Sequence, residues 1–212
     1  MVARALEQLR AALPSGVQLV AVSKFHPVSR LMEAYDAGQR IFGENRPQEL
    51  AAKVPQMPAD VQWHFIGHLQ TNKLKLVLPY VTLVQSVDSL HLLEAISAWA
   101  VANNRVIDIL LELHLGAEET KHGFTEDEIL NLAHPAGVRI RGLMGMATNT
   151  DDWAVVERDF ERIEGLFRKI QAMGLPDFDQ LSIGMSGDWP LAVKHGATMV
   201  RIGTDIFGPR EY

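Results

Sequence analysis

Lys24 stands directly after a short apolar run, a position that could give its amine unusual chemistry. The run from Leu19 to Ser23 has the character of a buried strand, which would carry the amine to the rim of a partly desolvated cavity. Burial lowers the pKa of an amine and frees the lone pair that Schiff-base chemistry needs. An ordinary surface lysine is the commoner interpretation of such a residue, and position alone does not choose between the two.

The segment Met185-Ser-Gly-Asp-Trp-Pro190 resembles the start of a helix that could face an anion. Ser186 and Gly187 would open the helix, and Pro190 fits its first turn. Free backbone N–H groups and the helix dipole favour negative charge at such a place. Taken alone, the segment is more often an ordinary N-cap.

The last apolar run ends in Arg201-Ile-Gly-Thr204. It offers the guanidinium of Arg201, close backbone approach at Gly203 and the hydroxyl of Thr204. If the chain is a barrel of alternating strands and helices, the loops after the seventh and eighth strands are where phosphate usually binds. The two loops together therefore predict a phosphate site.

Polar residues also follow the other apolar runs. They are Gly43-Glu44-Asn45, Gly67 to Gln70 with Asn72-Lys73, Glu112 with His114, and Met144 to Asn149. His64 and His68 suggest a metal pair, but they flank a strand end and share no helix face, and no third ligand is evident. No metal site is expected.

An alternation of short apolar runs and longer helical segments must position these residues. The apolar runs are Leu19 to Ser23, Arg40 to Phe42, Trp63 to Ile66, Thr82 to Gln85, Ile107 to Leu113, Val138 to Leu143, Gln180 to Ile183 and Met199 to Ile202. Each crossover helix makes successive strands parallel. The pattern favours a closed (β/α)8 TIM-type barrel of the α/β class over an open doubly wound sheet, with an extra amphipathic helix over Met1 to Leu13.

The expected helices lie between these runs, at Ser29 to Asp36, Pro47 to Val54, Thr71 to Leu78, Ser89 to Asn103, Thr125 to Leu132, Asp151 to Met173 and Gly187 to His195. Thr125 and Glu128 have the spacing of a capping box. Asp88 is expected to be the N-cap, or an acidic residue of the first turn, of the helix that begins there.

The composition narrows the class of protein. With 212 residues, 47% apolar and 22% charged, the chain is expected to be a single domain over residues 1–212. A net charge of −6 and the lack of a basic block with aromatics argue against nucleic acid as a partner. The absence of cysteine excludes disulfides and thiolate chemistry. No segment resembles a signal peptide or a membrane span, so the cytoplasm is the expected location.

Seven stretches in order along nearly the whole chain resemble the pyridoxal 5'-phosphate (PLP) homeostasis protein family. They are Val20-Ala-Val-Ser-Lys24, Phe42-Gly-Glu-Asn-Arg-Pro-Gln-Glu49, Trp63-His-Phe-Ile-Gly-His-Leu-Gln-Thr-Asn-Lys73, Lys121-His-Gly123, Arg141-Gly-Leu-Met144, Leu181-Ser-Ile-Gly-Met-Ser186 and Met199-Val-Arg-Ile-Gly-Thr-Asp-Ile-Phe-Gly208. The resemblance implies a fold-type III PLP barrel related to the N-terminal domain of alanine racemase.

The resemblance also implies residue roles. Lys24 would hold PLP covalently, and Asn45 would lie beside the cofactor. Ser186, with Gly187 next to it, and Gly203 and Thr204 would bind the phosphate. Arg201 would contact either the pyridine ring or the phosphate, and both contacts remain open. Lys121 and His122 would form either a solvated turn or a secondary contact.

Three functions are compatible with these residues. The first is a protein that buffers or delivers PLP, to apo PLP-dependent enzymes among others, without robust turnover, acting as a monomer or a weak homodimer. The second is an amino-acid racemase, but the second domain that supplies such enzymes with a catalytic tyrosine is expected to be missing here, and no residue is assigned as catalytic. The third is a phosphosugar enzyme, which would not require Lys24.

Overall fold

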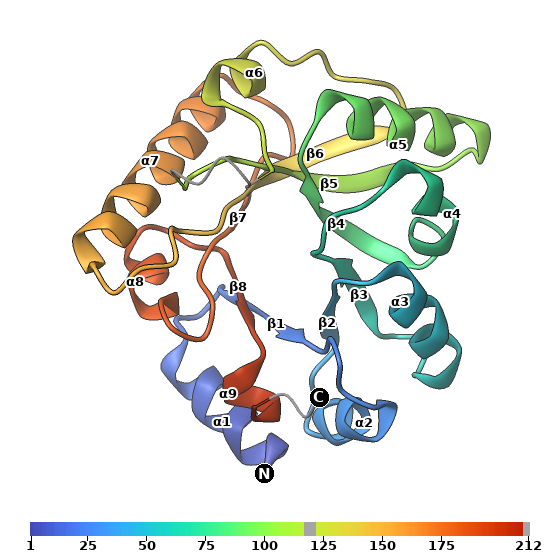
Figure 1. Ribbon diagram of the computed structural model, residues 1–212, viewed down its shortest axis with the longest axis vertical. Coiled ribbons are helices and arrows are strands. Elements are labelled where there is room, and N and C mark those ends of the chain that lie inside the picture. The colour runs from blue at the N-terminus through green and yellow to red at the C-terminus, as the bar shows by residue number, and fades with distance from the viewer. Residues whose placement is uncertain (117–121, 210–212) are drawn as a thin grey trace.

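The computed structural model describes residues 1–116 and 122–209. Its strands form a closed parallel barrel in which each strand pairs with the next and β8 pairs with β1 (Figure 1). The strands are β1 Gln18–Val22, β2 Ile41–Glu44, β3 Gln62–Phe65, β4 Val81–Val87, β5 Ile107–Glu112, β6 Val138–Met144, β7 Gln180–Ser182 and β8 Met199–Ile202. The predicted closed barrel is confirmed, and the open sheet is excluded.

Helices surround the strand ring (Figure 1). They are α1 Val2–Ala12, α2 Val28–Asp36, α3 Pro47–Lys53, α4 Leu74–Val77, α5 Leu90–Ala102, α6 Glu126–Leu130, α7 Trp153–Ala172, α8 Trp189–Lys194 and α9 Thr204–Phe207, with short 3-10 turns at Val54–Gln56 and Thr71–Lys73. The amphipathic helix α1 buries Val2, Leu6 and Leu9, as its periodicity predicts. The short α9 was not predicted. Among the described residues, none of the helices combines the length and apolar character needed to cross a bilayer.

Local signals set several helix starts. The capping box of Thr125 and Glu128 is present, with both reciprocal hydrogen bonds. The prediction for Asp88 was wrong. Ser89 caps α5, because its hydroxyl accepts from the N–H of Leu92. The Asp88 carboxylate turns instead toward His68.

The barrel interior is filled by alternate residues of the strands. Its apolar part is a buried cluster of Val20, Leu83, Leu110, Met144 and Met199. A larger apolar core fills the layer between strands and helices. Alternate residues of a strand point to the same face, so the inward positions lead directly to the residues at the barrel mouth.

Close approach of strands requires glycine at one position. Gly142 of β6 has φ +154°, and a Cβ there would lie 1.7 Å from the carbonyl oxygen of Gln180 in β7. The β5–β6 register shifts between Ile109 and Leu110, next to this contact. Any larger residue at 142 would push these strands apart.

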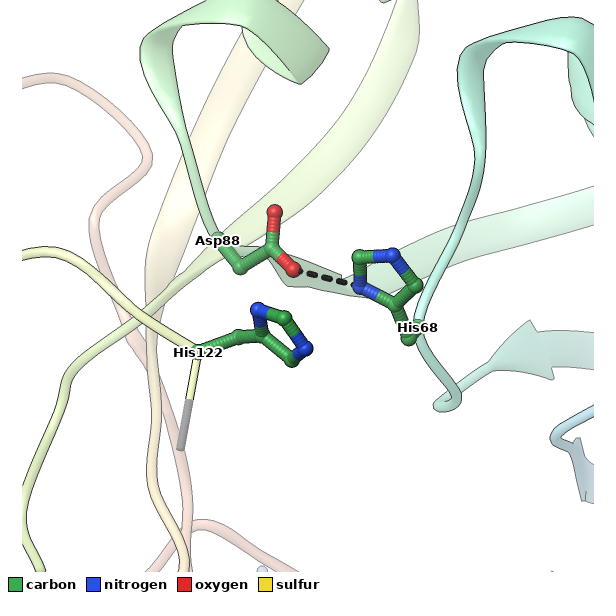
Figure 2. A group of neighbouring side chains, drawn as sticks. All are labelled: His68, Asp88 and His122. Atoms are coloured by element: carbon green, nitrogen blue, oxygen red, sulfur yellow. Dashed lines mark hydrogen bonds and ion pairs between the residues drawn. The ribbon is translucent and has the colours of Figure 1, made fainter. Parts of the chain in front are cut away.

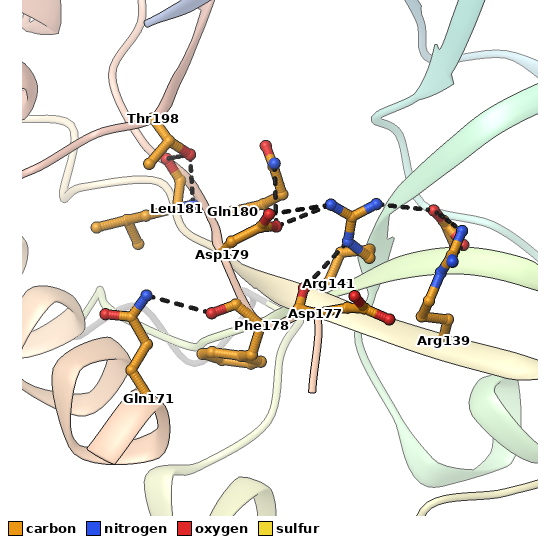
Figure 3. A network of polar contacts seen from close by, with 10 residues as sticks. Arg139, Arg141, Gln171, Asp177, Phe178, Asp179, Gln180, Leu181 and Thr198 are labelled. Atoms are coloured by element: carbon orange, nitrogen blue, oxygen red, sulfur yellow. Dashed lines mark hydrogen bonds and ion pairs between the residues drawn. The ribbon is translucent and has the colours of Figure 1, made fainter. Parts of the chain in front are cut away.

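A polar network closes the end of the barrel at which the strands begin (Figure 3). Arg141 donates to Asp108 at 3.1 Å, to Asp179 at 2.9 Å and to the carbonyl oxygen of Asp177 at 3.0 Å. Arg139 adds two hydrogen bonds to Asp108, at 2.8 and 2.9 Å. The network links β5 and β6 to the segment that leads into β7.

Candidate functional site

The residues predicted for the site converge on one cavity of about 250 Å³ at the mouth of the barrel. All seven of Lys24, Asn45, Ser186, Gly187, Arg201, Gly203 and Thr204 line it. Its other walls are Met146 and Met185, which belong to the polar segments noted after the strands, and Val22, His26, Ile66 and Gly208, which the sequence analysis did not single out as site residues. The volume lies near the lower end for ligand cavities, about 300 to 1,000 Å³, so it suits a small ligand.

Lys24 reaches the cavity because of the strand before it. Val20 points into the barrel and Val22 lines the cavity, so Lys24 continues the same face by the period of two. Lys24 is half-buried. The next residue, Phe25, has φ +67°, a left-handed conformation that is costly for an aromatic residue.

A buried group of ionic side chains holds the backbone on both sides of Lys24. Lys53 donates to the carbonyl oxygen of Ser23 at 2.8 Å, to Glu44 at 2.7 Å and to Glu49 at 2.6 Å. Glu49 also accepts from the N–H of Phe25 at 2.7 Å. The backbone at residues 23 and 25 is therefore held on both sides of Lys24 by hydrogen bonds with side chains of α3.

Glu44 is the most buried member of this group. It also accepts from the Ser23 hydroxyl at 2.5 Å and has no exposed surface. Burial raises the pKa of its carboxyl, and the charge of Lys53 opposes this change. Sequence reasoning missed Glu49 and Lys53; the available signal was their i, i+4 spacing in the helix directly after β2.

Arg201 is fixed within the barrel mouth. Its guanidinium donates to the hydroxyl of Ser182 at 2.6 Å, to the carbonyl oxygen of Ser182 at 2.8 Å and to that of Gly145 at 2.9 Å. Burial lowers its pKa to about 10, which leaves it charged at neutral pH, and the charge of Glu112 opposes the change. These contacts hold the guanidinium toward the ends of β6 and β7.

The two predicted phosphate loops lie on the same cavity, with one correction to their geometry. Helix α8 begins at Trp189 with Pro190 in its first turn, so Ser186 and Gly187 precede the helix and do not open it. Asp188 accepts from the N–H of Met185 at 2.6 Å and shapes this turn. Gly187 has nothing within 4 Å of the position of a Cβ, which leaves its backbone open to a ligand.

The histidines noted in the sequence separate in the structure. His64 is buried inside the barrel, 2.8 Å from Gln85, and burial lowers its pKa to about 3. His68 lies at the barrel mouth, where it contacts Asp88 and stacks on His122. Lys121 lies outside the described residues.

A family model described as alanine racemase, N-terminal domain, matches residues 2–211 of the chain. Among curated proteins, the pyridoxal phosphate homeostasis protein of Vibrio alginolyticus is 37% identical, over 97% of this chain and 92% of the relative. The protein with that name from Schizosaccharomyces pombe is 40% identical, over 92% of this chain and 84% of the relative.

Solved structures show the same likeness. The structure of PipY from Synechococcus elongatus with PLP bound has a TM-score of 0.89 and 38% identity, and the match covers 98% of this chain and all of PipY. Alanine racemase from E. faecalis shares the fold, with a TM-score of 0.74 at 18% identity over 98% of this chain and 57% of the racemase.

Proposed function

We propose a function for this chain from the premise that it belongs to the alanine racemase N-terminal domain family, with relatives named as pyridoxal phosphate homeostasis proteins. The chain binds PLP at the barrel mouth and serves to buffer or deliver it in the cytoplasm, without robust turnover. The observation that carries the proposal is the convergence of Lys24 and the two phosphate loops on one small cavity.

The residues present fit the chemistry of PLP. An amine is needed to bond the aldehyde carbon, and Lys24 is the lysine that lines the cavity. Hydroxyls and backbone N–H groups suit a phosphate, and Ser186, Gly187, Gly203 and Thr204 offer them. A buried side-chain oxygen of Asn45 has no hydrogen-bond partner in the described structure, so it is available to a ligand in the cavity.

We assign Arg201 to the pyridine nitrogen. Its guanidinium extends toward Ser182 and Gly145, across the barrel mouth, and these contacts support a place beside the ring. A fixed cation beside the ring nitrogen disfavours protonation of that nitrogen. When bound, PLP supplies an aldehyde and an electron-accepting ring, and this arrangement weakens the ring as an electron sink, which suits storage better than turnover.

The placement of tyrosines also supports storage over racemisation. Tyr35 bonds to Asp60 at the end of the barrel where the strands begin, and Tyr80 lies just before β4 at that same end. Tyr212 lies outside the described residues. A racemase needs acid–base groups on both faces of its substrate, and neither described tyrosine lines the cavity.

The attachment can be tested by reducing the PLP-loaded protein with borohydride and mapping the modified lysine by mass spectrometry. Label is expected on Lys24 and should vanish in Lys24→Ala. Label confined to another lysine would refute the assignment.

The delivery role needs a second assay. Mixing the loaded protein with an apo PLP-enzyme should restore that enzyme's activity slowly, while chiral analysis of alanine shows no racemisation. Racemisation at ordinary enzyme rates, about 1 to 1,000 per second, abolished by Lys24→Ala, would favour the enzyme over the carrier.

A further inference from the structure

A second cavity adjoins the PLP cavity and is lined by imidazoles and carboxylates. The two cavities share Asn45, Ile66 and Met146 as walls. The second one also contains His68, Asp88, Glu112 and His122. Nothing in the proposed binding of PLP uses these four side chains.

Three of the four side chains come together from separate loops (Figure 2). His68 follows β3, Asp88 follows β4 and His122 precedes α6. Each offers one ligand atom, and these atoms lie within 4.8 Å of one another. Nδ1 of His68 is 2.8 Å from a carboxylate oxygen of Asp88, and the rings of His68 and His122 stack at 4.4 Å between centroids.

Glu112 adds a further acidic group to the same cavity. Its side chain lines the same cavity and is 8% exposed. Burial raises the pKa of Glu112 to about 7, the neighbouring charge of Asp88 adds to this rise, and the charge of Arg201 opposes it. A second carboxylate beside Asp88 concentrates acidic groups in this cavity, and a bound cation would offset their mutual repulsion.

We propose that His68, Asp88 and His122 bind a divalent transition-metal ion, with the Glu112 carboxylate facing the same cavity. Two imidazoles and a carboxylate suit zinc, iron, cobalt or nickel, whereas magnesium and calcium prefer oxygen ligands alone. Lone pairs of stacked rings do not point to a common centre, so one ring must rotate when the ion binds. His68 and His122 are exposed, which leaves them free to rotate. The proposal does not rest on the bound PLP.

The experiment is a calorimetric titration of the purified full-length protein with zinc and cobalt ions, each repeated in excess magnesium. One tight site that magnesium does not displace is expected. His68→Asn and His122→Asn should each weaken binding by at least about tenfold, since loss of a group that merely supports a metal ligand already costs about 10- to 100-fold. His91→Asn, an exposed histidine on α5, is the matched control and should bind like wild type.

His122→Asn is the decisive variant. If His68 and Asp88 form only an ion pair, this variant leaves the pair intact and metal affinity unchanged, and the proposal fails. It fails equally if wild type shows no saturable site at millimolar zinc, or if His91→Asn loses as much affinity as the other two. Lys24→Ala should keep the site, because its four side chains do not include Lys24; parallel loss of metal and PLP in this variant would place the ion on the cofactor.

Discussion

At the scale of single residues, the environment of Lys24 depends on a buried ion group that never enters the cavity. Lys53 is paired with Glu44 and Glu49, and together they hold the backbone at Ser23 and Phe25. Removing one partner of a buried pair leaves an uncompensated charge. The strained φ at Phe25 persists only while its surroundings enforce it.

Lys53→Met is therefore expected to destabilise the protein by about 3 to 5 kcal/mol, the usual cost of breaking a buried pair. Urea unfolding followed by circular dichroism measures the change. Lys169→Met, at an exposed position of α7, is the control and should shift stability by less than about 0.5 kcal/mol. Adding Glu44→Gln to Lys53→Met should recover part of the loss; no recovery would contradict a charge-pairing role.

The positions of Lys24 and Arg201 on the cavity could be predicted from the sequence, because residues at the strand ends of a barrel line its mouth and the period of two sets their direction. For Lys53, the i, i+4 spacing predicts only a pair with Glu49, because its contact with the backbone of residue 23, thirty positions away, depends on the fold. Asp88 shows the same limit. Its place before a helix predicts a cap, but neighbouring Ser89 takes that role, and only the fold brings His68 and His122 to its carboxylate.

At the scale of elements, the proposed phosphate site depends on Gly203 and Thr204, where β8 passes into α9. Glycine is favoured at position 203 because a Cβ there would make tight contacts with β1, at 3.3 Å from both the Cβ and the carbonyl oxygen of Val22. Thr204 adds a hydroxyl at the start of α9.

Thr204→Ala is expected to weaken PLP binding by about 1.5 to 3 kcal/mol, the value of one hydrogen bond to a charged group. Binding of pyridoxal, which lacks the phosphate, should change little. Fluorescence titration with both compounds makes the comparison, and Thr82→Ala, at an exposed position near the start of β4 that does not line the cavity, is the control. Equal losses for PLP and pyridoxal would place the phosphate elsewhere.

Strands β3, β4 and β7 meet in a polar layer inside the barrel. His64 accepts a hydrogen bond from the amide of Gln85 at 2.8 Å, and Gln85 accepts from the hydroxyl of Ser182 at 2.7 Å. His64 must be neutral to accept, which agrees with its pKa of about 3. Its pKa in the unfolded chain is near 6.5, so between these values the unfolded state binds more protons.

The contribution of neutral His64 to the free energy of unfolding should therefore be present above pH 6.5 and be lost as the pH drops toward 3. About 3 kcal/mol of this contribution should be gone by pH 4. Urea unfolding of wild type and His64→Gln across this range isolates the contribution, because all other titrating groups are common to both. The free energy of unfolding of wild type should fall relative to that of His64→Gln as the pH falls. A constant difference would show that His64 is not held neutral.

At the scale of the whole molecule, the closed ring depends on contacts that a sequence pattern does not contain. The alternation of strands and helices fits an open sheet almost as well, because both use the same parallel units. Closure requires β8 to pair with β1, as it does from Gln18 with Met199 to Ala21 with Ile202. These partners lie at opposite ends of the chain, so periodicity within a short window could not reveal them.

The network at the base of the barrel links β5 and β6 to the segment that leads into β7. Arg141 joins Asp108 of β5 to Asp179 beside β7, and its side chain is 25% exposed, whereas that of Arg139 is 47% exposed. Arg141→Ala removes the hydrogen bonds to Asp179 and to the carbonyl oxygen of Asp177 and one of those to Asp108, and should cost about 1 to 3 kcal/mol. Arg139→Ala, at a more exposed pair, should cost less than about 1 kcal/mol. Urea unfolding of both variants tests this order; equal effects would mean that Arg141 acts only as a surface charge and not as the tie between β5 and β7.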